Sequence, residues 1–389
     1  MNRIFSLLCV AALSIALCAQ DGFQFSTIKE NPITSIKNQN RSGTCWSYSG
    51  LALLESELLR MGKGEHELAP MFVAHHTYQD RGVNYVRFYG EAPLGQGGSF
   101  YDVIYCLKRY GIAPQQIYKG IEYGDSLPNH NELELLMTAT LKAIGNSKIK
   151  PLSPVWKNAY IGILDAYMGK IPETFQWQGK DYTPLSYAQS LGLKPDDYIS
   201  LTSYTHHPFY TQFAIEVPDN WRNGLSYNLP IDEFMEVMDN AIMSGYTFAW
   251  GSDVSSSGFT RDGIGVVPDM KADGDLTGSD AARWIGLTEK ERNQKRLTEP
   301  SPEIWATQEM RQNAYDSWDL TDDHGMLIYG IAKDQTGKDY YMVKNSWGEA
   351  GNYKGIWYAS KSFVRHYTMN ILVHKDAIPT AIRRKLNIK

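Results

Sequence analysis

The chemistry of this chain is indicated by polar side chains that occur in a particular order. Cys45 opens an apolar segment, and Gln39 precedes it by six positions. His324 and Asn345 follow far downstream. A cysteine nucleophile needs a base, a group that orients this base, and a donor to the oxyanion. We therefore expect Cys45 to be the nucleophile and His324 its base. Asn345 would orient the imidazole, and Gln39 would donate to the oxyanion together with the Cys45 backbone N–H.

Each of these residues also has an ordinary structural explanation when it is considered alone. A single cysteine is often an inert core residue, and His324 alone is compatible with a strand histidine satisfied in the core. Asn345 is compatible with a turn, and Gln39 with a surface amide. Their joint occurrence favours the catalytic interpretation. Asp323, beside the histidine, is expected to be an electrostatic neighbour with no step of its own.

The segment 44–62 is predicted to be a helix, because its leucines recur with helical spacing and Gly62 is a natural stop. Thr44 is the expected N-cap. Cys45 would then lie in the first turn, where the helix dipole favours a thiolate. Since pairing with histidine can lower a thiol pKa to about 3–4, we expect an ionised sulfur at neutral pH.

Further helices and strands are expected on both sides of these residues. The apolar patterns predict helices over 99–110, 132–144 and 231–244, and a solvated helix over 288–296. The last quarter contains short β-rich runs at 326–331, 340–344, 355–358 and 369–373. This division predicts an α+β fold with the nucleophile on a helix, the other two groups on strands, and the active site in a cleft between two subdomains.

Length and composition limit the class of protein. The 389 residues suffice for one large or two ordinary domains. Hydrophobic residues make up 43% and charged residues 21%, which is typical of a globular chain. The net charge of −5 does not indicate a nucleic-acid partner. Nothing in the sequence indicates a homo-oligomer, and the oligomeric state is left open.

The N-terminus has the pattern of a secretory signal over 1–19. Arg3 precedes an apolar run over 4–17, and Ala19 ends the segment before polar residues. The run is too short for a membrane span, and no later run is long enough. We therefore expect an exported protein, periplasmic or secreted, with a catalytic domain over 20–389. A lipoprotein anchor at Cys18 is less favoured, because the preceding leucine is bulky.

The mature chain would keep two cysteines, Cys45 and Cys106. The second lies on an apolar helical face, which predicts a buried free thiol. Two histidine pairs, His75-His76 and His206-His207, could suggest a metal ion. However, no carboxylate or cysteine lies at a matching helical spacing, and adjacent histidines do not easily share one ion. We therefore expect no metal ligands and no cofactor.

The stretch 42–46, Ser-Gly-Thr-Cys-Trp, resembles the Cys-Gly-[Ser/Ala]-Cys-[Trp/Tyr] signature of papain-like cysteine peptidases. The resemblance implies a papain-like fold with a helical N-terminal part and a β-barrel-like C-terminal part. Ser42 replaces the first cysteine, so papain's disulfide there cannot form. His324 lies 279 residues after Cys45, against about 130–150 in papain and cathepsins. This spacing implies a large insertion, which we place at approximately 115–230 and 266–315.

Both departures are typical of the bleomycin hydrolase and aminopeptidase C family. Gly97-Gly98 resembles the glycine pair whose backbone holds the substrate, and 110–114 resembles that family's Tyr-Gly-Val-x-Pro. The Asn-Ser-Trp-Gly-Glu stretch at 345–349 also fits. The resemblance implies peptide substrates, bound at Gly97, Gly98 and Trp347. The tryptophan could also shield the bond between His324 and Asn345 from water.

The resemblance leaves the mode of cleavage open. The family's C-terminal arm normally enters the cleft and restricts it to free N-termini, whereas this chain stops at Lys389, where that arm would begin. The resemblance itself implies an aminopeptidase. The missing arm favours the alternative, an endopeptidase or oligopeptidase with an open cleft, so we expect N-terminally blocked peptides to be tolerated. A non-catalytic peptide-binding relative and an acyl transferase on the same scaffold are further alternatives.

Overall fold

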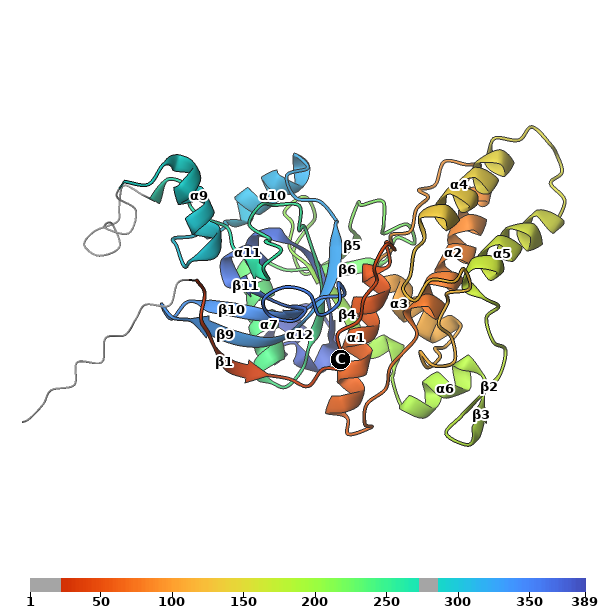
Figure 1. Cartoon of the computed structure of the whole chain (residues 1–389), viewed down its shortest axis with the longest axis horizontal. Coiled ribbons are helices and arrows are strands. Elements are labelled where there is room, and N and C mark those ends of the chain that lie inside the picture. The colour runs from red at the N-terminus through yellow and green to blue at the C-terminus, as the bar shows by residue number, and fades with distance from the viewer. Residues whose placement is uncertain (1–21, 273–285) are drawn as a thin grey trace, which may run out of the picture.

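The computed structural model describes residues 22–272 and 286–389. The expected signal segment 1–19 lies outside the described residues. The chain divides into a half built on a β-sheet and a half built mainly of helices, and helix α1 (Cys45–Arg60) runs between them (Figure 1). The N-terminal end of α1 carries the cysteine, so the helix that separates the two halves also positions the expected nucleophile.

The helices occupy both halves of the chain. The remaining α-helices are α2 (Pro70–Arg87), α3 (Phe100–Arg109), α4 (Asn131–Gly145), α5 (Val155–Met168), α6 (Pro184–Leu191), α7 (Ile231–Met243), α9 (Glu289–Thr298), α10 (Gln308–Asp316), α11 (Lys361–Tyr367) and α12 (Thr380–Lys385). Short 3₁₀ turns are η1 (Pro195–Asp197) and η3 (Lys375–Ala377). The helices predicted over 44–62, 99–110, 132–144, 231–244 and 288–296 are confirmed as α1, α3, α4, α7 and α9.

Most strands belong to one sheet. They are β1 (Phe25–Glu30), β4 (Tyr198–Thr202), β5 (Gln212–Ala214), β6 (Leu225–Asn228), β7 (Phe248–Ser252), β8 (Ile264–Gly265), β9 (His324–Asp334), β10 (Asp339–Lys344), β11 (Ile356–Ser360) and β12 (Thr368–His374). A separate hairpin is formed by β2 (Phe175–Trp177) and β3 (Lys180–Tyr182). The four β-rich runs of the last quarter are confirmed as β9 to β12.

The large sheet has the order β5-β6-β4-β12-β7-β9-β10-β11-β8, and β1 pairs with β9. Most pairs are antiparallel, whereas β4 with β6 and β8 with β11 are parallel. Among the described residues, strand pairing runs from β5 at one edge to β8 at the other, so the sheet is open. The resemblance, in contrast, implied a barrel-like sheet. The α+β class itself is confirmed.

The sheet is covered by helices on both faces because its central strands alternate between two cores. On β9, Leu327 and Tyr329 pack in the core that contains α1 and α3, whereas Met326 and Ile328 pack in the core that contains α7 and α11. Helix α1 lies against β7 and β9. Since β9 begins with the histidine, this packing brings the N-terminal end of α1 toward the start of that strand.

Helix α1 forms where its leucine spacing predicted. Leu51, Leu54 and Leu58 are fully buried, and truncating one such side chain costs about 2–5 kcal/mol. Thr44 stands at the N-cap position as expected, but its side chain makes no capping hydrogen bond to the helix backbone, so the predicted capping role was wrong. Its hydroxyl instead lies 2.6 Å from the Ser42 hydroxyl, so the turn before the helix is fixed by this pair.

The segment assigned to an insertion does not form a unit of its own. Helices α4 and α5 pack on α2, and β4 to β6 extend the large sheet beside β12. Figure 1 shows α2, α4 and α5 together at the end of the helical half. The placement of the insertion relative to papain stays a prediction. Within the part of the chain that the structure describes, there is no helix of the length and apolarity that a bilayer crossing requires.

Candidate active site

Cys45 is the first residue of α1, and its side chain lines a cavity at the boundary between the two halves. His324 and Gly325, the first residues of β9, line the same cavity. The backbone N–H groups of Gly325 and Trp46 act to lower the pKa of the thiol. The structure therefore brings the expected nucleophile and its expected base to one cavity from positions 279 residues apart in the sequence. Cys45 and Cys106 are both free thiols, and the predicted burial of Cys106 is confirmed.

His324 is held by Asn345, which directly follows β10 and does not lie within a strand. The ring nitrogen Nε2 of His324 and the amide oxygen Oδ1 of Asn345 are 2.8 Å apart. The backbone N–H of Ser346 donates to the same oxygen at 2.7 Å, which identifies this atom as the acceptor. Nε2 of His324 must then carry the hydrogen, so in the neutral ring Nδ1 is free to take a proton.

Trp347 covers this histidine. Its ring stacks on that of His324 with centroids 4.7 Å apart and an angle of 27° between the planes. Trp357 and Phe259 pack edge-on against Trp347 and fix its position. Trp347 is nevertheless 37% exposed, so one side of the indole faces solvent. The geometry agrees with a shield over the imidazole, and substrate binding by Trp347 stays a prediction.

The charge states of the Cys45 and His324 side chains differ from those expected from the sequence. Burial, together with Asp322 and Asp219, raises the pKa of the Cys45 thiol to about 12, and the backbone N–H groups of Gly325 and Trp46 oppose this rise. Burial also lowers the pKa of His324 to about 4, against the bond to Asn345. Each group alone is therefore held neutral at pH 7, whereas the sequence analysis expected a thiolate already formed.

The segment that leads into β9 is fixed by carboxylates. Asp253 accepts the backbone N–H and the hydroxyl of Thr321 at 2.8 and 3.0 Å. Asp323 accepts the Thr321 hydroxyl at 2.8 Å and the backbone N–H of Ser255 at 3.1 Å. These bonds tie the residues before His324 to the end of β7. Asp323 is thus a positioning residue, which agrees with the expectation that it performs no step.

Gln39 is buried beside the motif that contains Asn345. Its amide nitrogen donates to the Ser42 carbonyl at 2.7 Å, and its amide oxygen accepts the Ser346 hydroxyl at 2.5 Å. Its side chain is not part of the wall of the Cys45 cavity. One of the two amide hydrogens remains for another acceptor. The role of Gln39 at the oxyanion therefore stays a prediction.

The two glycines of 97–98 have different surroundings. Gly98 lines the cavity, and a Cβ at this position would lie 2.8 Å from the Trp46 ring. Gly97 is not part of the wall, and a Cβ there would lie 1.9 Å from a carboxylate oxygen of Asp219. Only Gly98 is thus placed for contact with a ligand in this cavity, and Gly97 leaves room for Asp219.

The sequence analysis missed two cavity carboxylates, Asp219 and Asp322. Burial and, to a smaller extent, repulsion from Asp219 and Asp323 together raise the pKa of Asp322 to about 7. Burial raises the pKa of Asp219 as well, while Arg81, 3.7 Å away, opposes this rise. Asp322 stands two residues before His324, which could have drawn attention to it. Asp219 lies in a loop without any recognisable sequence pattern, so no local signal pointed to it.

The rest of the cavity comes from distant parts of the chain. Its wall includes aromatic, aliphatic and polar residues of α3, of the segment 215–226 and of β12: Phe100, Tyr101, Ile215, Val217, Asn220, Leu225, Ser226, Met369 and Asn370. The segment 215–226 lies inside the stretch 115–230 that the sequence analysis assigned to an insertion. One side of the cavity is therefore built by residues that no motif marked.

The two histidine pairs differ in the structure. His75 is buried and bonds to the Tyr118 hydroxyl at 2.6 Å, and His76 stacks on Tyr110 with centroids 4.0 Å apart, so both have structural contacts. His206 and His207, in contrast, lie near a common carboxylate, Glu216. This third group follows ten residues later and not at a helical spacing, which is why the sequence pattern did not include it.

Comparison with known proteins adds to this geometry. Residues 309–389 match the model of the Peptidase C1-like family. Aminopeptidase C from Streptococcus thermophilus is 22% identical over 395 residues, which cover 88% of this chain and 80% of the relative. Cysteine proteinase 1, mitochondrial, from Saccharomyces cerevisiae is also 22% identical, over 94% of this chain and 80% of the relative.

The fold is shared with a solved structure. PepW from Lactobacillus rhamnosis HN001 superimposes with a TM-score of 0.69 at 18% identity, over 93% of this chain and 84% of that chain. This likeness extends across both halves of the molecule and shows the fold. The C-terminal part of the chain thus matches the Peptidase C1-like family, and most of its length is homologous to aminopeptidase C and to cysteine proteinase 1.

Proposed function

We propose that this protein is a cysteine peptidase that hydrolyses peptide bonds through Cys45, His324 and Asn345. The observation that carries the proposal is the 2.8 Å bond between His324 Nε2 and Asn345 Oδ1, in a site where His324 shares a cavity with the free thiol of Cys45. Since the cysteine, the base and its orienting group are all present, the homologous aminopeptidases support the same chemistry here.

In the first step the Cys45 sulfur attacks the scissile carbonyl carbon, and its proton passes to Nδ1 of His324. Transfer within the pair leaves the total charge of the cavity unchanged, so the burial that opposes each charge alone is offset by their mutual attraction. The N-terminal end of α1 and the N–H of Gly325 stabilise the thiolate. Asn345 holds the imidazolium that results.

In the following steps the tetrahedral oxyanion collapses and the amine leaves with the proton from His324, which gives a thioester on Cys45. Gln39 and the Cys45 backbone N–H would donate to the oxyanion, where one donor is typically worth about 10²–10³ in rate. His324 then takes a proton from water as the water attacks the thioester. The carboxylic acid is released and the thiol is restored.

The substrate class that the cavity favours is a peptide with a free N-terminus. Asp219 and Asp322 place two carboxylates in the cavity that contains the nucleophile, and their repulsion is relieved by a cation. The α-ammonium group of a peptide supplies such a cation. Related proteins bear the names aminopeptidase C and aminopeptidase G, which agrees with this choice.

The proposal is tested with paired fluorogenic peptides that differ only in N-terminal acetylation. We expect kcat/KM to be at least about tenfold higher for the free peptide, equal to about 1.4 kcal/mol of binding in the transition state. Cys45→Ala should cleave neither. Equal cleavage of both peptides would establish the endopeptidase alternative. Absence of cleavage of any peptide by the pure protein would favour the non-catalytic relative.

We also propose that the protein is exported, because residues 1–19 have the pattern of a secretory signal. N-terminal sequencing of protein recovered from the periplasm or the medium should begin at Gln20. A chain that retains Met1 in the cytosol would contradict export. A diacylated Cys18 would support the lipoprotein alternative.

A further inference from the structure

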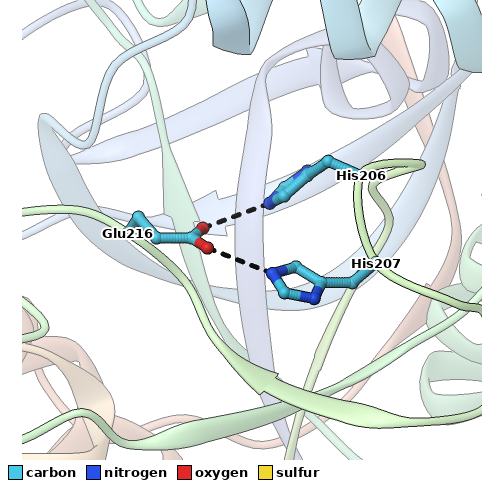
Figure 2. A group of neighbouring side chains, drawn as sticks. All are labelled: His206, His207 and Glu216. Carbon is cyan, nitrogen blue, oxygen red and sulfur yellow. Dashed lines mark hydrogen bonds and ion pairs between the residues drawn. The ribbon is translucent and has the colours of Figure 1, made fainter.

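A second group of converging side chains lies beside the catalytic cavity. His206 and His207 stand in the loop between β4 and β5, and Glu216 lies just beyond β5 (Figure 2). The Nε2 atom of each histidine lies 3.1 Å from a different oxygen of the Glu216 carboxylate. The three potential ligand atoms all lie within 4.8 Å of one another. The arrangement brings two imidazoles and one carboxylate to a common point.

The two imidazoles are held in place by their surroundings. The His206 ring stacks on Tyr315 with centroids 5.5 Å apart and a 15° angle. Its Nδ1 lies 3.1 Å from the Gln312 amide nitrogen and 3.4 Å from the amide oxygen, and this oxygen can accept the Nδ1 hydrogen when Nε2 binds an ion. The His207 ring stacks on Phe213 with centroids 4.2 Å apart. Groups that orient the far side of an imidazole are typical of sites at which histidine binds a metal ion.

The loop backbone is fixed as well. The amide nitrogen of Asn228 donates to the carbonyl oxygens of Tyr204 and His207 at 2.7 and 2.9 Å. The backbone N–H of Thr205 donates to the Gln312 amide oxygen at 2.6 Å. Adjacent histidines usually point in different directions, and these bonds hold the turn that makes both rings face Glu216.

We propose that His206, His207 and Glu216 form a binding site for a divalent transition-metal ion, Zn²⁺ in the first instance. Zinc bonds of about 2.0–2.2 Å in tetrahedral geometry place neighbouring ligand atoms roughly 3.3 Å apart. The histidine-to-carboxylate separations of 3.1 Å are already close to this spacing. The two nitrogens are at most 4.8 Å apart, so they need to approach by about 1.5 Å or less.

The donor set selects the class of ion. Two imidazole nitrogens and one carboxylate favour zinc and its neighbours in the transition series over Mg²⁺ and Ca²⁺, which prefer oxygen ligands. The side chains are 28%, 37% and 57% exposed for His206, His207 and Glu216, so the ion can enter from solvent and keep a water ligand. On binding, each Nε2 exchanges its hydrogen bond to the carboxylate for a bond to the ion, and its hydrogen moves to Nδ1 by way of solvent, or is lost to solvent if the ring is doubly protonated.

The position of the site connects it to the cavity wall. Glu216 lies between Ile215 and Val217, which both line the catalytic cavity. Asp219 follows three residues after Glu216 and lines it too. An ion bound to the loop histidines and to Glu216 would therefore link the loop to the wall of the cavity.

The site is tested by isothermal titration of untagged protein with zinc chloride, in a Cys45→Ala background so that the catalytic thiol does not compete. We expect one ion per chain with a micromolar or lower Kd. His207→Ala and Glu216→Gln should each weaken binding at least about tenfold. The matched control is His66→Ala, which removes a partly exposed histidine that contacts Tyr187 and should leave the Kd unchanged.

Glu216→Gln keeps the size of the side chain, so it separates loss of a ligand from loss of fold. Zinc should also raise the unfolding temperature of the parent protein and leave that of a His206→Ala/His207→Ala double variant unchanged. The absence of stoichiometric zinc binding to the parent would overturn the proposal. An equal zinc affinity in the parent and the double variant would do so too.

Discussion

Replacement of Asn345 by alanine isolates the orienting role in the proposed mechanism. The Asn345 amide oxygen accepts two buried N–H groups, from His324 at 2.8 Å and from Ser346 at 2.7 Å. The variant leaves both donors without this acceptor, and an unsatisfied buried donor costs about 1–3 kcal/mol. The Asn345 amide nitrogen has no partner among the described residues, so its removal returns part of this energy. We expect a loss of unfolding free energy of about 1–4 kcal/mol.

The effect on turnover follows from the same bond. Loss of about 1–3 kcal/mol of orientation in the transition state corresponds to roughly a 5- to 150-fold decrease in kcat. KM should change little, because Asn345 is not part of the wall of the Cys45 cavity. Asn345→Asp can accept the same two hydrogens, so it should recover most of the activity. The assay is steady-state hydrolysis of a free fluorogenic peptide, with urea unfolding of each variant in parallel.

The matched control is Asn31→Ala. Asn31 is 3% exposed and its amide nitrogen donates to the carbonyls of Ile242 and Tyr246 at 3.0 and 2.8 Å. This variant should lose stability by a similar amount and keep its kcat. An Asn345→Ala enzyme with unchanged kcat would refute the reasoning. So would an equal decrease in kcat in the Asn31→Ala control, because the effect would then arise from stability alone.

Further predictions concern charge and burial. Because the pKa of Asp322 is raised to about 7 by burial and its acidic neighbours, its charge is lost as pH falls through 7, so KM for free peptides should rise below pH 7. Asp322→Asn should abolish this rise in KM, and a pH profile of KM that is unchanged in the variant would contradict the assignment. Because the variant removes a charge that repels the thiolate, it should also speed the alkylation of Cys45 by iodoacetamide. Burial lowers the pKa of His130 to about 4, so between about pH 6.5 and 4 the unfolded chain binds the extra proton and stability falls with falling pH. His130→Gln should reduce that slope by about 1.4 kcal/mol per pH unit in urea unfolding, and an unaltered slope would contradict the assignment. Glu55→Ala should cost about 3–5 kcal/mol, because it leaves the Leu68 N–H and the Thr34 hydroxyl without their buried acceptor and removes one of the two carboxylates that pair with Lys37; a loss below about 1 kcal/mol would count against this.

The elements that position the proposed catalytic residues were predictable from the sequence because their patterns are local. The leucine spacing of α1 and the continuous apolar run of β9 mark elements that are buried on nearly all sides, and such local patterns are visible in the sequence. Ser99 starts α3 with a capping box, a feature of adjacent residues. The order of cysteine, histidine and asparagine then limited the site to a junction between these elements.

The parts that sequence analysis missed depend on contacts between distant residues. Strands β2, β3 and β5 have three residues each, too few for a period to be recognised. Asp219 reaches the cavity only because its loop folds across Gly97. The resting charge of Cys45 depends on burial and on Asp322, which helix position alone does not report.

The contact between Glu216 and the two loop histidines also depends on tertiary packing that the sequence pattern does not report. The two histidines are adjacent in the sequence, a pattern that argues against their binding one ion. Glu216 follows a strand and does not lie one helical turn away from them. The bonds from Asn228 that turn both imidazoles to one side come from the next strand, β6. Such an arrangement is specified by tertiary packing and leaves no periodic signal.

The central claim is that the sulfur of Cys45 forms a covalent thioester with the substrate. The most direct test is acid quenching during the first turnovers of an activated ester or amide, followed by proteolysis and mass spectrometry. We predict that the acyl group is found on the fragment that contains Cys45, and that Cys45→Ala neither forms this adduct nor releases product. An adduct on Cys106, or full turnover by Cys45→Ala, would contradict the account.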